Sequence, residues 1–198
     1  MIYFVVLSIG AGLILGRWVL PVELVSHLDA LTTAALCLLL VGIGIDIGSK
    51  KEVWPRLCLM GWRVMLVPVL VAVGSILGSI AAGVFIGMPL KEASAIGAGF
   101  GWYSFSGVLL TKIYSLETGT LAFLSNVMRE IISFIVIPVL AARFGRLAAV
   151  APGGATTMDT TLPLIAKSTD TDTAIIAIIN GTTLSAFVPF LIPLLINL

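Results

Sequence analysis

One polar stretch decides how this chain folds: Gly153-Gly154-Ala155-Thr156-Thr157-Met158-Asp159-Thr160-Thr161-Leu162-Pro163. It holds two glycines, four threonines, a carboxylate and a proline, yet long apolar runs flank it on both sides. Helix-poor, polar backbone at membrane depth is tolerated only where protein or a water-filled cavity surrounds it. Asp159 in such a stretch is therefore a candidate site residue.

The composition indicates an all-α integral membrane protein. Of the 198 residues, 59% are hydrophobic and 11% are charged, and the mean hydropathy is +1.17. Several apolar runs reach the length of about 20 residues that a transmembrane helix needs. The net charge of +1 includes no basic block, so the charge pattern does not favour nucleic-acid binding.

We expect a single polytopic membrane domain over residues 1–198, with about five full transmembrane helices and two broken, re-entrant helical hairpins. Residues 1–90 hold three spans, and residues 91–198 hold two hairpins and two spans. We interpret the first span as a retained transmembrane helix rather than a signal peptide, because no basic region precedes it. The last span is expected to be interrupted at Asn180-Gly181-Thr182-Thr183 and by two prolines. The expected spans cover residues 2–20, 31–47, 57–86, 118–144 and 171–198.

The two hairpins are expected to enter the membrane from opposite faces. The first covers residues 92–113 and is broken by glycines between Gly97 and Gly107, whereas the second covers residues 148–168. Broken segments of opposite orientation are typical of the midplane site of a secondary transporter.

Basic residues predict the orientation of these segments. Lys50, Lys51 and Arg56 favour a cytoplasmic second loop, and hence a cytoplasmic N-terminus. Arg143 and Arg146 then lie on the cytoplasmic side only if residues 92–113 enter from outside and return. The C-terminus is expected outside.

Glu130 lies far from either end of its span, and Asn126 shares its helical face. Arg129 points to a different side of the helix. An Arg129–Glu130 or Arg129–Asp159 pair that only holds helices together is one interpretation. Because ionisable residues are costly in a membrane, we favour a functional role, with Arg129 the most structural of the three.

The polar stretch offers groups that suit a bound amino acid. Gly153 and Gly154 allow the backbone to unwind, and the hydroxyls of Thr156, Thr157 and Thr160 are potential ligands for a cation or an ammonium group. Backbone N–H groups here, or near residues 101–104, are expected to bind a carboxylate. An ordinary cytoplasmic loop is the alternative, and the apolar flanks argue against it.

Two further polar groups are candidates for the site. Trp102, Tyr103 and Ser104 lie among the glycines of the first hairpin and either line a pathway or, for the aromatic rings, anchor at the membrane interface. Asn180 completes a polar cavity or hydrogen-bonds a neighbouring helix. Asp46 is expected to cap a helix or to pair with a nearby lysine.

An enzyme is not expected. His27 is the single histidine, which leaves neither a Ser/His pair nor a histidine-rich metal site. Cys37 and Cys58 lack a paired spacing and are interpreted as small buried hydrophobes. We expect no cofactor and no metal, with a proton or alternatively sodium as the coupling ion.

The chain resembles the lysine exporter (LysO) family over essentially all of its length. The resemblance is sharpest at Gly99–Gly107, at Asn126 to Glu130 and at Gly153–Pro163. It implies an inner-membrane exporter of L-lysine and close analogues, driven by proton entry, in which Glu130 and Asp159 are the embedded acidic residues. Relatives often carry Asn-Asp where this chain has Ser125-Asn126, and a histidine at the position of Asn180.

Longer members of this family carry further spans ahead of the matching region. A homodimer or a separate small membrane subunit is therefore the expected partner, beside the lipid bilayer and a cationic amino acid. Our hypothesis is proton-coupled antiport, in which Asp159 and Glu130 alternately hold the substrate and a proton. An ion-conducting channel, or a noncatalytic subunit of a larger membrane complex, is the alternative.

Overall fold

The computed structural model describes residues 61–198 and scattered positions between residues 11 and 49. The chain separates into two compact units, Met1–Ile45 and Asp46–Leu198. The predicted spans at residues 2–20 and 31–47, and the loop that carries Asp46 and Lys50, lie outside the continuously described part. In the first unit, the described positions are helical.

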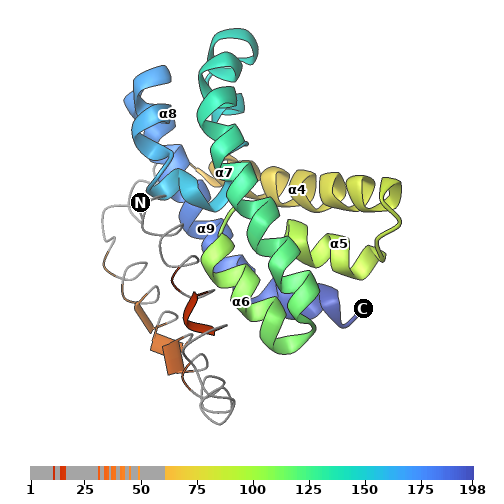
Figure 1. Ribbon diagram of the computed structural model, residues 1–198. Coiled ribbons are helices and arrows are strands. Elements are labelled where there is room, and N and C mark those ends of the chain that lie inside the picture. Colours follow the sequence, from red (N-terminus) through yellow and green to blue (C-terminus); the bar gives the residue numbers. More distant parts are fainter. Residues whose placement is uncertain are drawn as a thin grey trace. The chain divides into compact units, whose positions relative to one another are not determined.

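The described part of the second unit is helical and contains no strand, as the composition predicts (Figure 1). Helices α4, α7 and α9 are long and apolar enough to cross a membrane, with mean hydropathies of 2.1, 1.7 and 2.0. The elements are η2 (Trp62–Met65), α4 (Leu66–Phe85), α5 (Leu90–Gly97), α6 (Tyr103–Ile113), α7 (Leu116–Phe144), η3 (Leu147–Val150), η4 (Gly154–Met158), α8 (Leu162–Ser168) and α9 (Thr171–Ile196).

Side-chain caps fix where the two longest helices begin. The Ser115 hydroxyl accepts a hydrogen bond from the Thr118 N–H at the start of α7, and the Asp170 carboxylate accepts one from the Thr173 N–H at the start of α9. Each cap satisfies a donor that the first turn of a helix leaves unpaired. Helix α7 ends before Gly145, whose φ of 96° is unfavourable for other residues.

Both predicted breaks are present, and the first is shorter than the glycine pattern suggests. Residues 98–102 separate α5 from α6, with positive φ at Phe100 (49°) and Gly101 (95°). Gly107 lies inside α6 instead. A Cβ at Gly107 would lie 2.8 Å from Cβ of Phe123, so this glycine allows α6 to approach α7 closely.

The predicted interruption of the last span is wrong, because α9 continues through residues 180–183 and through Pro189 and Pro193. Gly181 packs against η4 rather than ending the helix. A Cβ at this position would lie 2.5 Å from the backbone nitrogen of Met158 and 2.7 Å from the carbonyl oxygen of Ala155. The glycine therefore provides space for a neighbouring backbone.

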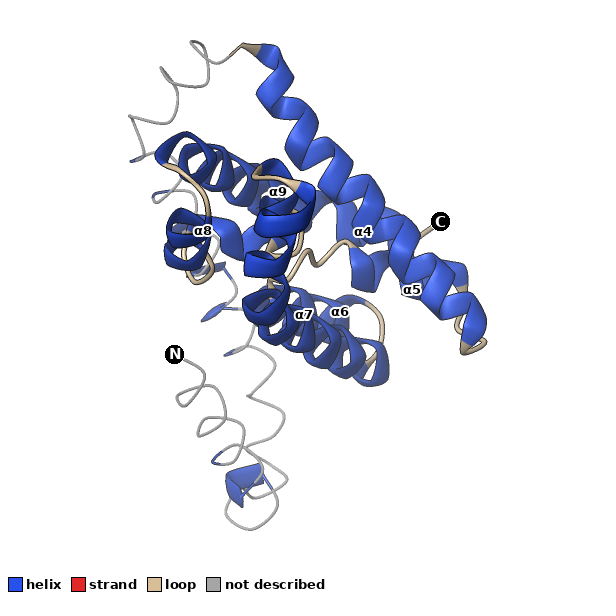
Figure 2. Ribbon diagram, turned by 90° about the horizontal axis from the view of Figure 1, so that it is seen from above, coloured by secondary structure: helices blue, strands red, loops and turns tan. Residues whose placement is uncertain are grey.

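The short elements pack between the long ones. Helix α5 lies alongside α4 (Figure 2), and α6 and α8 lie beside the N-terminal and C-terminal parts of α7 (Figure 1). Buried side chains from α7, η3, α8 and α9 form one apolar cluster, which consists of Ile137, Ala149, Val150, Ile165 and Ala177. This packing places both breaks in the interior of the unit.

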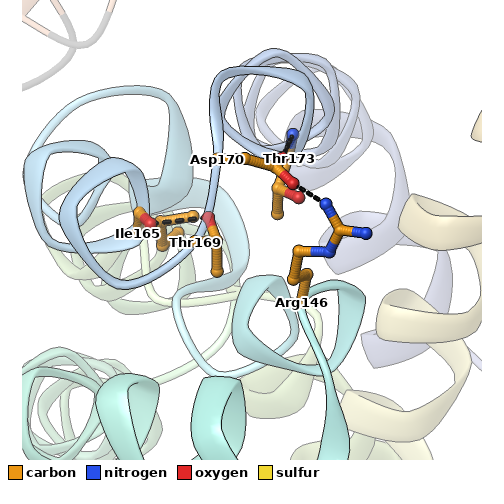
Figure 3. Close-up of polar contacts among 5 residues, drawn as sticks. All are labelled: Arg146, Ile165, Thr169, Asp170 and Thr173. Carbon is orange, nitrogen blue, oxygen red and sulfur yellow. Dashed lines mark hydrogen bonds and ion pairs between the residues drawn. The ribbon is translucent and has the colours of Figure 1, made fainter.

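Polar contacts join the two ends of each broken segment. The Glu92 carboxylate accepts hydrogen bonds from the Tyr114 hydroxyl at 3.0 Å and from the Thr118 hydroxyl at 3.1 Å. Arg146 forms an ion pair with Asp170, the capping residue of α9 (Figure 3). Residues 92–114 and 146–170 therefore each return to the region from which they start.

The cap of α9 predicts a pH dependence of stability. Hydrogen bonds from Thr173, with Arg146 beside the carboxylate, lower the pKa of Asp170 from 3.8 to about 2. The ionised carboxylate therefore favours the folded state above pH 3.8, and this contribution is lost as the pH falls through about 2. We expect Asp170→Asn to flatten the decrease in the melting temperature of the purified protein over this range.

Asp172→Asn is the matched control, because it removes an exposed carboxylate from the same helical turn. Identical melting profiles for the wild type and Asp170→Asn between pH 4 and pH 2 would contradict this prediction.

Candidate functional site

The two breaks meet backbone to backbone. The N–H of Ala155 donates a hydrogen bond of 2.8 Å to the carbonyl oxygen of Phe100. A Cβ at Gly154 would lie 2.2 Å from the same oxygen, and the φ of Gly154 is +58°, so this contact requires glycine. We call the two meeting segments, residues 98–102 and 151–158, the crossover.

Helices α7 and α9 each hold one side of the crossover with a buried asparagine. On α7, the Asn126 Oδ1 accepts the N–H of Gly101 at 2.6 Å. On α9, the Asn180 Nδ2 donates to the carbonyl of Gly154 at 3.0 Å and to the hydroxyl of Thr157 at 3.1 Å. The Oδ1 of Asn180 is the one buried side-chain N or O atom without a hydrogen-bond partner among the described residues.

Two of the predicted threonines stabilise the break from within. The Thr156 hydroxyl donates to the carbonyl of Gly153, and the single proton of the Thr157 hydroxyl has the carbonyls of Gly154 and Ala177 as its two acceptors, at 2.7–2.8 Å. Both side chains are buried. Their hydroxyls therefore connect η4 to the residues at its start and to α9.

The two predicted carboxylates lie near each other, and Thr160 lies between them. Glu130 is buried on α7, whereas Asp159 is exposed at the end of η4. Asp159 Oδ1 accepts the N–H of Thr160 at 2.5 Å and its hydroxyl at 3.2 Å, and the same Thr160 side chain lies beside the Glu130 carboxylate. The Tyr103 hydroxyl lies within electrostatic range of both carboxylates. A titratable cluster therefore flanks the crossover.

The aromatic residues of the first hairpin lie next to this cluster. Trp102 stacks on Phe105 with ring centroids 4.7 Å apart, and Tyr103 contacts Phe123 edge-on at 5.6 Å. Ser104 is exposed on α6. A small cavity of about 40 Å³ opens beside Trp102, and Asp159 and Ser185 line it together with residues of η4.

Arg129 points away from the carboxylates. Its guanidinium donates from Nε to the carbonyl of Pro152 at 2.9 Å, from Nη2 to the carbonyl of Ala151 at 3.3 Å, and from Nη1 to the hydroxyl of Ser75 at 2.6 Å. No carboxylate among the described residues forms an ion pair with it. Neither of the ion pairs considered from the sequence, with Glu130 or with Asp159, is formed.

A larger cavity of about 350 Å³ lies between α4, α5 and α7, with Arg129 in its wall. Its other polar side chains are Ser75, Ser79, Ser125 and Asn126, and the rest of the lining is mainly apolar. The sequence interpretation did not include Ser75 or Ser79. Their spacing of four residues on the third span, which places both on one helical face, is the signal that could have identified them.

The close backbone contact at the crossover leads us to expect that any side chain at position 154 destabilises the folded protein. We expect Gly154→Ala to lower the melting temperature by roughly 5 °C or more, because a Cβ at positive φ would also clash with the Phe100 carbonyl. Gly78→Ala on α4 is the matched control, since nothing lies within 4 Å of its Cβ position. An equal effect of the two substitutions on the melting temperature of the purified protein would contradict this prediction.

Comparison with known proteins identifies relatives along almost the whole chain. The sequence profile described as "Lysine exporter LysO" matches residues 6–196. The protein "Lysine exporter LysO" of Escherichia coli K12 is 36% identical over 166 residues, which cover 84% of this chain and 55% of that protein. The protein "Putative lysine exporter" of Haemophilus influenzae is 33% identical over 144 residues, which cover 73% of this chain and 71% of that protein.

No solved structure matches the chain. The chain spans about half the length of the E. coli relative. A match over residues 6–196, with three helices apolar enough to cross a membrane, shows a membrane-inserted protein of a transporter family rather than an enzyme. The chain belongs to the lysine exporter LysO family.

Proposed function

We propose that this chain forms the core of a secondary transporter that exports L-lysine or a related cationic amino acid by proton-coupled antiport. The observation that carries the proposal is the position of Glu130 and Asp159, which share Thr160 beside the crossover. The names of both relatives add support, because each refers to lysine export.

Cation exchange follows from the chemistry of this carboxylate pair. Two neighbouring carboxylates repel each other when both are ionised, and either a proton or an ammonium group relieves that repulsion. Binding of lysine therefore favours release of the proton, and protonation favours release of lysine. A shared cation site is a sufficient physical basis for antiport, because each ligand lowers the affinity for the other.

The joined ends of the broken segments support the proposed topology of about five full spans and two re-entrant hairpins. Glu92 meets Tyr114 and Thr118 near the start of α7, whereas Arg146 meets Asp170 beyond its end. Because α7 is long enough to cross a membrane, the two hairpins enter from opposite faces.

The basic residues indicate which end of α7 lies on the cytoplasmic side of the membrane. Arg143, Arg146 and Lys167 lie at the end of α7 and in α8, which we therefore place on the cytoplasmic side of a prokaryotic inner membrane. The N-terminus is then cytoplasmic and the C-terminus outside. A second copy of the chain or a separate small membrane subunit is the proposed partner, and the mass of the purified complex in detergent tests it.

Transport in proteoliposomes tests the antiport mechanism. An imposed pH gradient is expected to accelerate lysine flux, and Asp159→Asn is expected to remove that acceleration and to lower the flux about tenfold or more. Glu130→Gln should have a similar effect, because it keeps the shape of the buried side chain and removes its charge.

Asp172→Asn is the matched control, since Asp172 is an exposed carboxylate in the first turn of α9 and does not line the cavity beside Asp159. Full flux that still follows the pH gradient in Asp159→Asn would refute the mechanism. Single-channel currents without saturable lysine counterflow would favour an ion-conducting channel instead.

A further inference from the structure

Arg129 carries a positive charge that the described structure does not balance. Its three hydrogen-bond acceptors, the carbonyls of Ala151 and Pro152 and the hydroxyl of Ser75, are all neutral. These three bonds use three of the five N–H donors of a guanidinium group. A charge taken out of water in a membrane protein is costly unless a counter-charge accompanies it. The guanidinium therefore has both the charge and the free donors to bind an anion.

The hydrogen bonds hold this guanidinium rigidly at the wall of the larger cavity. The Ser75 hydroxyl accepts from Arg129 at 2.6 Å and donates to the carbonyl of Gly97 at 2.8 Å, which links α4, α5 and α7. A Cβ at Gly154 would lie 3.0 Å from Nη2 of Arg129, so the guanidinium also packs on the crossover. A pre-organised guanidinium suits a carboxylate, because its planar N–H groups match the two oxygens.

Four of the backbone donors expected from the sequence to bind a carboxylate are already engaged. The N–H of Gly101 donates to Asn126, and that of Trp102 donates to the carbonyl of Gly99. The N–H groups of Ala155 and Thr156 donate to the carbonyls of Phe100 and Gly153. Arg129 provides a charged side-chain donor at the crossover that still has capacity for an anionic ligand.

The cavity beside Arg129 defines what kind of anion fits. Its volume of about 350 Å³ is in the range of small-molecule sites, and its walls are apolar except for the serines, Asn126 and Arg129. Such a cavity suits a molecule with one anionic end and an aliphatic body. Glu130, the next residue of α7, does not line this cavity, so the charged contact that the cavity offers a substrate is the one to its carboxylate.

We propose that Arg129, held in place by Ser75, binds the α-carboxylate of the exported amino acid in this cavity. This inference rests on the proposed function, since it assigns one end of the transported substrate. It separates the roles of two regions: Arg129 recognises the carboxylate in the larger cavity, whereas Glu130 and Asp159 carry the cation exchange beside the crossover. If Arg129 serves only to connect α4 to the crossover, removing the carboxylate from the ligand will not change the ligand's affinity.

A ligand comparison with the unmodified protein tests whether a carboxylate is bound. The probes are L-lysine and 1,5-diaminopentane, which is lysine without its carboxylate, and the readout is the ligand-dependent rise in melting temperature. We expect 1,5-diaminopentane to bind at least about tenfold more weakly than lysine. Equal affinities would overturn the inference and leave the proposed function intact, whereas no stabilisation by lysine at any pH would overturn both.

Cysteine protection tests whether the ligand occupies this cavity. In a background with Cys37→Ser and Cys58→Ser, Ser125→Cys places a thiol in the cavity wall, and Thr120→Cys places one on an exposed part of α7 outside the lining. Saturating lysine is expected to slow N-ethylmaleimide labelling of Ser125→Cys about tenfold, and 1,5-diaminopentane at the same concentration is not. Labelling of Thr120→Cys should not respond. Unprotected Ser125→Cys in a variant that lysine still stabilises would overturn the inference.

Arg129→Gln assigns the effect to the guanidinium. The expected result is a ratio of lysine to 1,5-diaminopentane affinity close to one, because the variant no longer distinguishes the carboxylate. A loss of stability without a change in this ratio would show a structural role only and would overturn the inference. If the variant does not fold, the two preceding experiments still decide.

Discussion

A single backbone hydrogen bond, from the N–H of Ala155 to the carbonyl of Phe100, joins the two broken segments, and the surrounding structure depends on it. A helix break inside a membrane protein releases backbone groups that water cannot satisfy. Here the released groups of one break are satisfied by the other break and by side chains of the long helices. This explains why Phe100 is fully buried with a positive φ of 49°, an unfavourable conformation that the neighbouring segment holds in place.

The two halves around the crossover are built in the same way. Each consists of a broken segment, a polar contact that joins its ends, and a long helix that begins at a side-chain cap, either Ser115 or Asp170. One buried asparagine of that helix then holds one of the two breaks. The two halves follow one another along the chain and run in opposite senses through the unit, because α6 packs beside the start of α7 and α8 beside its end. The crossover is the place that both halves share.

Much of this arrangement could be predicted from local sequence patterns, and the exceptions have a common cause. Glycines at 101 and 154 predicted the breaks, because positive φ is a local property of the backbone. Gly107 and Gly181 were misleading, since they serve close packing against another element, which depends on tertiary structure. The nearness of Glu130 and Asp159 was expected, but the partners of Arg129 were not. They are backbone carbonyls and Ser75; the spacing of Ser75 and Ser79 marks a shared helical face, but it does not indicate which side chain contacts that face.

Asn126 and Asn180 each hold one of the two breaks, but a movement of the surrounding helices would affect their hydrogen bonds differently. Asn126 makes four hydrogen bonds, and a shift of α5 and α6 would strain the three that leave α7, to Ile96, Gly101 and Ser106. The Oδ1 of Asn180 accepts none, so a shift that brings a donor to this atom recovers roughly 1–3 kcal/mol. A movement beside Asn180 that supplies a donor therefore gains a hydrogen bond, whereas a movement beside Asn126 loses existing ones.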